Sequence, residues 1–278
     1  MTLSNVKISE GIFPIDQFGK MGKIHSVFDR SFNLKVGERL INVANYSGYL
    51  ASFGLYLEDT LYQSLVPYLQ QDNLVKVFSK GLMIYSREGI KKITWSDCEI
   101  VSLQAKNIQL TKEQQDVLKA VLEEAQVETK IGLPIDCHAR QIFAKLRQKE
   151  LTPSEWNEII SYLIGRGKGL TPSGDDILVA YLVMLYVRKD SRSISLSHAF
   201  KQRLLSTTDI SKEYIWYARQ GYVNSLVYQL YIDLKNNKEK EVIAYDVQQV
   251  MRIGHSSGND LCYGLLLAID DEEKERIT

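Results

Sequence analysis

The chain has 278 residues, of which 45% are hydrophobic and 24% charged, as is ordinary for a soluble globular protein. Its 34 basic and 34 acidic side chains balance, which argues against a protein that coats nucleic acid or an acidic membrane surface. Three isolated cysteines, Cys98, Cys137 and Cys262, form no CxxC pair and fit a reducing compartment. Because we find no secretory signal and no apolar run near the ~20 residues of a membrane span, we expect a cytoplasmic protein with no membrane or nucleic-acid partner.

The first 107 residues have the pattern of short strands separated by turns. Strands are predicted within Lys23–Val36, Arg39–Asn45, Leu74–Ser86 and Ile93–Leu103. Gly37 supplies a turn between the first two segments, and Lys80-Gly81 divides the third into two strands. Residues 47–71 have mixed periodicity with room for one helix. We expect a small sheet or a partly closed barrel.

Beyond Lys106-Asn107 the hydrophobic period becomes that of helices. Thr111 with Gln114, and Thr152 with Glu155, are capping-box patterns that predict two helix starts. Further helices are predicted at residues 135–149, 174–188, 195–205, 212–234, 245–252 and 258–269. The chain is therefore predicted to be an α+β protein, with a β-rich domain at residues 1–107 packed on a larger helical domain at residues 108–278.

The stretch GRGKGLTPSGDD, residues 165–176, runs directly into a long apolar helical segment. Ser173 and Asp176 have capping-box spacing, so we expect a helix start with free backbone N–H groups and a positive dipole end. The glycines before it allow close approach to a ligand, and Lys168 adds positive charge, which together suit a phosphate or a carboxylate. The alternative is a glycine-rich connection followed by a capped helix. The stretch does not match a Walker A motif.

A second stretch, GHSSGND at residues 254–260, also leads into an apolar helical segment. Its residues 257–260 align with residues 173–176, and a small residue, Ala180 or Gly264, stands four positions after each final aspartate. Two similar caps can arise by coincidence. The alternative is that both helix starts face one cleft that holds an anion. His255 is then a candidate proton donor, although a lone histidine is also commonly structural.

Two further features border this hypothetical cleft. Asp175 either binds a Mg²⁺ ion that neutralises a phosphate or adds a second favourable charge to the helix dipole. The segment STTDIS, residues 206–211, brings four hydroxyls before another helical segment, and Ser211 is predicted to be its N-cap. Because no metal-ligand cluster is recognisable in the sequence, we assign no metal ligand.

These motifs together resemble the AllH-type family. The resemblance rests on GLTPSGDD, on the TT-x-x-S segment, on GHxSGxD and on the early HSVFDRSFN, and it spans roughly residues 23–268. It implies one subunit of a three-component oxamate carbamoyltransferase of anaerobic allantoin catabolism. That enzyme interconverts oxalurate and phosphate with oxamate and carbamoyl phosphate. The implied partners are a small anionic or phosphorylated substrate and other protein subunits.

We therefore expect a subunit of a carbamoyl-transfer enzyme, with a non-catalytic metabolite-binding or scaffold subunit as the alternative. The candidates for proton transfer are His255 and Asp176. The candidates for substrate binding are Gly167, Lys168, Gly169, Thr171, Ser173, Gly174, Asp175, Thr207, Thr208, Ser211, Ser257, Gly258 and Asp260.

Overall fold

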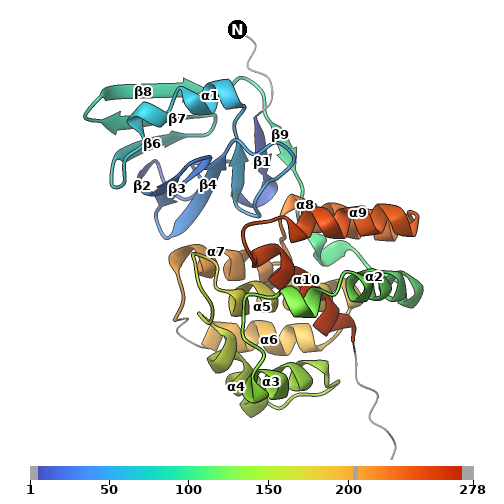
Figure 1. Ribbon diagram of the computed structural model, residues 1–278. Coiled ribbons are helices and arrows are strands. Elements are labelled where there is room, and N and C mark those ends of the chain that lie inside the picture. The colour runs from blue at the N-terminus through green and yellow to red at the C-terminus, as the bar shows by residue number, and fades with distance from the viewer. Residues whose placement is uncertain (1–5, 203–205, 271–278) are drawn as a thin grey trace, which may run out of the picture. The chain divides into compact units, whose positions relative to one another are not determined.

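The computed structural model describes residues 6–202 and 206–270 (Figure 1). The chain forms two compact units, Met1–Leu103 and Gln104–Thr278. The first is a curled sheet and the second is helical, so the predicted α+β class is confirmed. Within the described ranges, every helix falls short of the length and apolarity that a membrane crossing requires.

The N-terminal unit is one nine-stranded sheet with the order β8-β7-β6-β2-β3-β4-β5-β1-β9. Its strands are β1 Lys7–Ser9, β2 Met21–Phe28, β3 Ser31–Val36, β4 Arg39–Ala44, β5 Gly54–Tyr56, β6 Leu74–Phe78, β7 Gly81–Ser86, β8 Gly89–Thr94 and β9 Glu99–Val101. Neighbouring strands are antiparallel except for the β4–β5 and β1–β9 pairs. A short helix, α1 Asp59–Gln63, lies in the segment that was predicted to hold one.

The expectation of one strand over Lys23–Val36 is wrong, because this segment is a hairpin of β2 and β3. The strands close at the pair Phe28↔Ser31, which leaves Asp29-Arg30 as a two-residue turn. The Arg30 guanidinium donates to the carbonyl oxygen of Asn45 at 3.0 Å, which ties the turn to the end of β4. Asp29 is a common turn residue, but the turn has no glycine, asparagine or proline beside it, so its signal in the sequence is weak.

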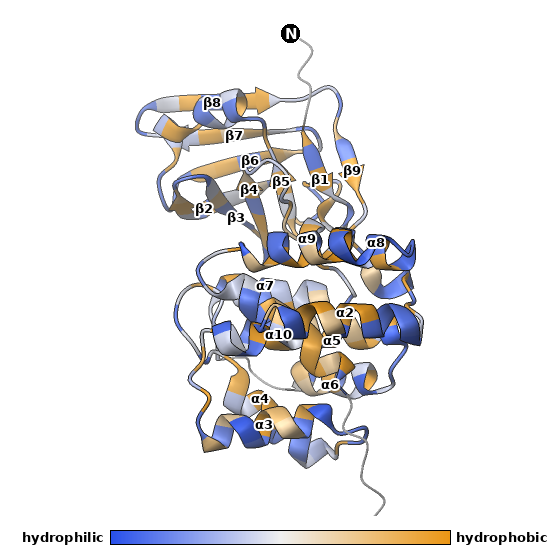
Figure 2. Ribbon diagram, turned by 45° about the vertical axis from the view of Figure 1, so that its right-hand side comes forward, coloured by the Kyte–Doolittle hydropathy of each residue, from blue (hydrophilic) through white to orange (hydrophobic). Residues whose placement is uncertain are grey.

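The helical unit is built around two neighbouring helices, α5 Ser173–Arg188 and α10 Ser257–Ile269 (Figure 1). The other helices are α2 Lys112–Glu124, α3 Cys137–Arg147, α4 Pro153–Leu163, α6 Arg192–Gln202, α7 Asp209–Ala218, α8 Ser225–Lys235 and α9 Lys240–Met251. Residues 173–187 are all buried, and from Ile177 on α5 is apolar on every side and forms the axis of the core (Figure 2).

Two of the predicted capping signals located helix starts correctly. The capping boxes at Thr111 and Thr152 are both present, and Pro153 occupies the first turn of α4 as predicted. The helix predicted at residues 195–205 is α6, although residues 203–205 lie outside the described ranges. The single helix predicted at residues 212–234 is wrong. The chain breaks at Gly221, where φ is +86°, and Asn224 then caps α8 with its side chain.

Candidate functional site

The starts of α5 and α10 meet through reciprocal hydrogen bonds between the two aligned motifs. The hydroxyls of Thr171 and Ser257 lie 2.9 Å apart. The Asp176 carboxylate of α5 is hydrogen-bonded to Ser257 at the start of α10, and the Asp260 carboxylate of α10 is hydrogen-bonded to Ser173 at the start of α5. Each motif therefore uses its last aspartate to bond the serine of the other motif, so the two helix starts lie side by side. The anion-binding cleft between them stays a prediction.

The glycines of the two motifs explain why the aligned residues follow the same path. A Cβ at Gly174 would stand 2.1 Å from the carbonyl oxygen of Leu163, at the end of α4. A Cβ at Gly258 would stand 2.1 Å from the carbonyl oxygen of Val250, near the end of α9. Since such distances are impossible for a real side chain, each helix start is pressed against the preceding helix in a way that only glycine permits.

The small residues one turn further along the two helices meet each other. A Cβ at Gly264 would lie 2.3 Å from the carbonyl oxygen of Ile177 and 3.0 Å from the Cβ of Ala180. The small residues at these positions therefore allow a direct contact between α5 and α10, which places the two helix starts side by side.

The predicted cap of α5 is wrong. Pro172 is the N-cap and makes no side-chain cap, because Ser173 is already the first helical residue and Asp176 is directed to Ser257. The Gly174 N–H donates to the carbonyl oxygen of Arg166 at 2.9 Å, and the equivalent Gly258 N–H donates to Ile253 at 2.9 Å. These two N–H groups, which were expected to be free for an anion, are satisfied within the protein.

Asp175 joins the motif to the STTDIS segment. Its carboxylate accepts from the Gly165 N–H at 2.8 Å, from the Ser211 hydroxyl at 2.6 Å and from the Thr207 hydroxyl. The Ser211 cap that the sequence suggested is wrong: Thr208 caps α7 by accepting from the Ser211 N–H, so the Ser211 hydroxyl is free to reach Asp175. Thr208 also donates to the carbonyl oxygen of Leu170. The STTDIS segment, residues 206–211, is thus hydrogen-bonded to the first motif stretch, residues 165–176.

The three aspartates of these motifs are buried, and burial raises their affinity for a proton. Burial raises the pKa of Asp176 well above its ordinary value, against a lowering by the Ser257 hydrogen bond and with a further rise from the charge of Asp260. Burial also raises the pKa of Asp175 and of Asp260, opposed in each case by hydrogen bonds. One oxygen of Asp176 and one of Asp260, the Oδ2 atoms, have no hydrogen-bond partner among the described residues. Both the burial and the charge of Asp260 favour the protonated form of Asp176.

The side chains that reach solvent come from the loops before the two helices. Lys168, Gly169 and His255 are exposed, whereas Ser173, Asp176 and Asp260 are buried beneath them. Arg166, the other cation of the first loop, lies with its guanidinium carbon 4.0 Å from the centre of the Tyr162 ring. The structure therefore separates a buried carboxylate–hydroxyl cluster from the exposed side chains of Lys168 and His255, one on each loop.

Gly132 belongs to this cluster and was missed in the sequence. Its N–H donates to the Asp260 carboxylate at 2.8 Å, and a Cβ there would stand 2.3 Å from the Ser173 hydroxyl and 2.5 Å from the Ser256 hydroxyl. The local sequence around Gly132 carries no motif, so only the tertiary fold identifies it. Across residues 6–202 and 206–270, no group of three or more His, Cys, Asp or Glu side chains is arranged to hold a metal ion.

Comparison with known families supports the motif assignment. Residues 163–269 match the family model described as oxamate carbamoyltransferase subunit AllH. This range contains all three motif stretches and confirms the resemblance there. The extension of the resemblance back to residue 23 stays a prediction. No solved structure matches the chain.

Proposed function

We propose that the chain is a subunit of a carbamoyl-transfer enzyme, of the type that converts oxalurate and phosphate to oxamate and carbamoyl phosphate in the breakdown of allantoin. The observation that supports this most is that the matched range, residues 163–269, contains the two motifs whose residues Thr171 and Ser257 are in contact. The matched family is described as a subunit, so other subunits of the same enzyme are the proposed partners.

The ligand in this proposal is a small anion held at the outer surface of the two loops. Lys168 supplies a positive charge there, and His255 stands on the opposite loop beside Ser256 and Ser257. The positive-φ glycines Gly167 and Gly169 keep the first loop bare of side chains around Lys168, so that an anion can approach its backbone. Since the Gly174 N–H is already bonded, the loop rather than the first turn of α5 provides the binding surface.

The inner cluster has a positioning role and a candidate proton-transfer role in this proposal. Thr171 and Ser257 are both hydrogen-bonded to the Asp176 carboxylate, and they are half-buried, whereas Asp176 is buried. A protonated Asp176 can pass its proton outward through either hydroxyl, which is the role in general acid catalysis that a raised pKa favours. His255, which is exposed, is the alternative proton donor.

The test uses the intact chain with its partner subunits and measures phosphorolysis of oxalurate. Lys168→Ala and His255→Ala are expected to lower the rate at least tenfold without changing thermal stability, because both side chains are exposed. Lys112→Ala, which removes an exposed lysine of α2 paired with Asp116 at 2.9 Å, is the matched control. Unchanged rates for both loop variants would remove the proposed site.

Asp176→Asn and Ser173→Ala examine the inner cluster. Asp176→Asn is expected to alter the dependence of the rate on pH as well as its size, whereas a purely structural loss would scale the rate equally at every pH. Activity of the chain on its own would exclude a scaffold role. A complex in which Lys168→Ala, His255→Ala and Asp176→Asn all transfer the carbamoyl group at the normal rate would instead favour a scaffold subunit.

A further inference from the structure

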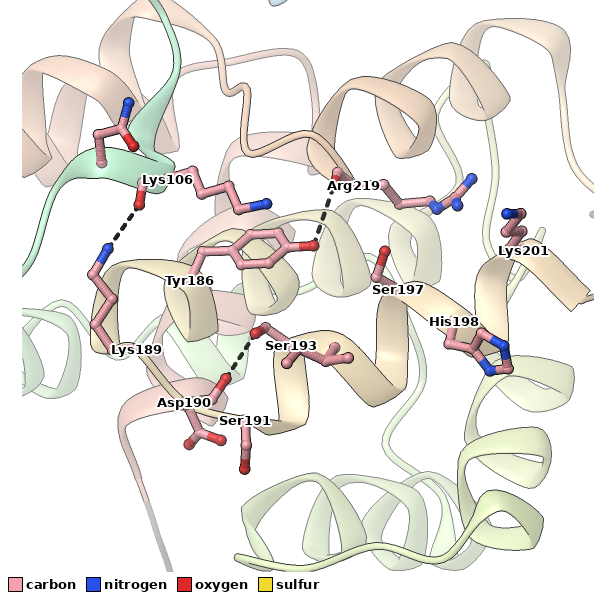
Figure 3. A pocket seen from close by; sticks show the side chains of 12 residues that line it. Lys106, Tyr186, Lys189, Asp190, Ser191, Ser193, Ser197, His198, Lys201 and Arg219 are labelled. Atoms are coloured by element: carbon pink, nitrogen blue, oxygen red, sulfur yellow. Dashed lines mark hydrogen bonds between the residues drawn. The ribbon is translucent and has the colours of Figure 1, made fainter.

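The helical unit contains a cavity of about 800 Å³ at the opposite end of α5 from the motif cluster (Figure 3). It is formed by the turn at Ala105–Asn107, the last turn of α5, the first three turns of α6 and the end of α7. Tyr186 lies thirteen residues after Ser173 on α5, which corresponds to roughly 20 Å along the helix. The cavity is therefore separate from the loops that carry the proposed function.

The side chains around this cavity are predominantly cationic. Lys106, Lys189, Lys201 and Arg219 line it together with His198. Among the described lining residues Asp190 is the sole acid, and its charge is neutralised by Arg192, whose Nη2 lies 2.6 Å from Asp190 Oδ2. The whole chain has equal numbers of basic and acidic residues, so this concentration of positive charge is local. Such a pocket attracts and retains anions.

The cations are held by contacts other than carboxylates. Lys106 Nζ lies 5.0 Å from the centre of the Tyr186 ring, and the Tyr186 hydroxyl donates to the carbonyl oxygen of Arg219 at 3.1 Å. Figure 3 shows the Lys106 chain extending across the ring, with the Arg219 guanidinium directed toward the side where Lys201 and His198 stand. The Arg219 Nε atom is buried and has no hydrogen-bond partner within the described part of the chain. A bound anion would satisfy it.

Helix C-terminal ends attract single cations, and this explains a lysine or arginine at the end of α5, α6 or α7 taken separately. It does not explain why the cations of three helices and Lys106 surround one concave space. In the part of the chain that the structure describes, none of these four side chains forms an ion pair with a carboxylate. A multiply charged anion is the ligand that complements several cations around one space.

Size and lining narrow the class of that anion. The volume lies in the range of small-molecule pockets, roughly 300–1,000 Å³, and exceeds what a single phosphate ion fills. Ile194, which is 72% exposed, and the Tyr186 ring provide apolar surface, while Ser191 and Ser197 add hydroxyls at the border. We propose that this cavity binds a small molecule with a diphosphate group, with Lys106 and Arg219 holding one phosphoryl group and Lys201 with Ser197 the other.

Calorimetric titration of the full chain with pyrophosphate, ADP, inorganic phosphate and adenosine tests this proposal. Pyrophosphate and ADP are expected to bind saturably at one site with dissociation constants below 1 mM, at least tenfold more tightly than inorganic phosphate, and more weakly as salt is raised. Adenosine is expected not to bind. Tighter binding of ADP than of pyrophosphate would show that the apolar surface of Tyr186 and Ile194 contacts the organic part of the ligand.

Arg219→Gln and Lys106→Gln are each expected to weaken the binding of ADP at least tenfold. Lys201→Glu, a reversal at an exposed position that leaves packing intact, is expected to do the same. The controls are Lys112→Gln, outside the cavity, and Lys168→Ala, in the loop of the proposed function, and both should bind ADP normally. Absence of saturable binding, binding of adenosine as tight as that of ADP, or binding insensitive to all three cavity substitutions would overturn the proposal.

Discussion

The hydroxyls of Thr171 and Ser257 lie 2.9 Å apart although 86 positions separate them in the chain. This contact lies at the centre of a reciprocal arrangement in which Asp176 is bonded to Ser257 and Asp260 to Ser173. The two segments of similar sequence thus bond each other, and neither acts as an independent cap of its own helix. The arrangement has measurable consequences for stability.

The first prediction is that the pair Ser173 and Asp260 is energetically coupled. Asp260→Ala leaves the Gly132 N–H and the Ser173 hydroxyl without their acceptor, so we expect a loss of about 1–3 kcal/mol in the free energy of unfolding. In a double-mutant cycle with Ser173→Ala, the two losses should fail to add by about 0.5 kcal/mol or more. Urea denaturation measures both quantities.

The control for that cycle combines Ser173→Ala with Asp116→Asn, on the exposed side of α2. The two changes share no partner, so their effects should add within about 0.5 kcal/mol. Full additivity of the Ser173 and Asp260 changes would show that the hydrogen bond across the two helices contributes nothing to stability.

The second prediction concerns the contact of α10 with α5 at Gly264. Gly264→Ala places a Cβ 2.3 Å from the Ile177 carbonyl oxygen, and a backbone atom cannot move aside as the end of a side chain can. We expect a destabilisation of about 1–3 kcal/mol, even though alanine favours helices more than glycine. Thermal and urea unfolding measure it. Glu241→Ala, at an exposed position of α9, should change stability by no more than about 0.5 kcal/mol. A Gly264→Ala variant as stable as the wild type would show that the helices separate easily.

Much of the helical unit could be predicted because its signals are local. The capping boxes at Thr111 and Thr152 need only residues three positions apart, and the apolar run after Ser173 predicts a buried helix whatever surrounds it. The similarity between residues 173–176 and 257–260 even indicated that the two starts belong together. That inference worked because both motifs carry the same side chains in the same order.

The errors in the site arose where a side chain had two competing partners. Asp176 has the spacing of a cap for its own helix, but the tertiary fold offers it Ser257, and Ser211 likewise leaves the cap position of α7 for Asp175. Local spacing cannot decide between such partners, because the competitor comes from a distant segment. Gly132 was missed for the same reason. The break before α8, in contrast, has a readable signal in Gly221 and Asn224 that the long helical pattern obscured.

The third prediction is that Arg192 cannot be replaced by lysine. Its buried guanidinium donates to both oxygens of Asp190 and to the carbonyl oxygens of Leu146 and Gln148, which connects the start of α6 to the end of α3. Lysine keeps the charge but lacks the planar fork, so at least two of these acceptors lose their donor. We expect Arg192→Lys to lower the free energy of unfolding by about 1–3 kcal/mol in urea denaturation. Arg140→Lys, on the exposed face of α3, is the control, and equal stability of the two variants would contradict the prediction.

The fourth prediction concerns the dependence of stability on pH. Burial, the charge of Asp233 and a hydrogen bond with Asp233 raise the pKa of Asp246 to about 6, so the contact between α8 and α9 holds a proton that the unfolded chain releases. Between the ordinary carboxylate pKa of 3.8 and about 6, the folded state binds more protons than the unfolded state. The free energy of unfolding contributed by this pair therefore falls as pH rises through that window, and the loss is complete above it.

Asp246→Asn removes this proton linkage while keeping the shape of the side chain. Between pH 4.5 and pH 7.5 the variant should lose less stability than the wild type, by an amount on the order of 1 kcal/mol, and it should be at least as stable as the wild type at pH 7.5. Urea denaturation at the two pH values gives the comparison. The pKa values of Asp175, Asp176 and Asp260 are also raised, so these residues lower the free energy of unfolding with rising pH in both proteins. Only the difference in that pH dependence between wild type and variant therefore reports on Asp246. Asp116→Asn controls for the loss of one negative charge, and its stability should depend on pH as that of the wild type does. If the stability of Asp246→Asn instead ran parallel to that of the wild type, the carboxylates of Asp233 and Asp246 would not share a proton.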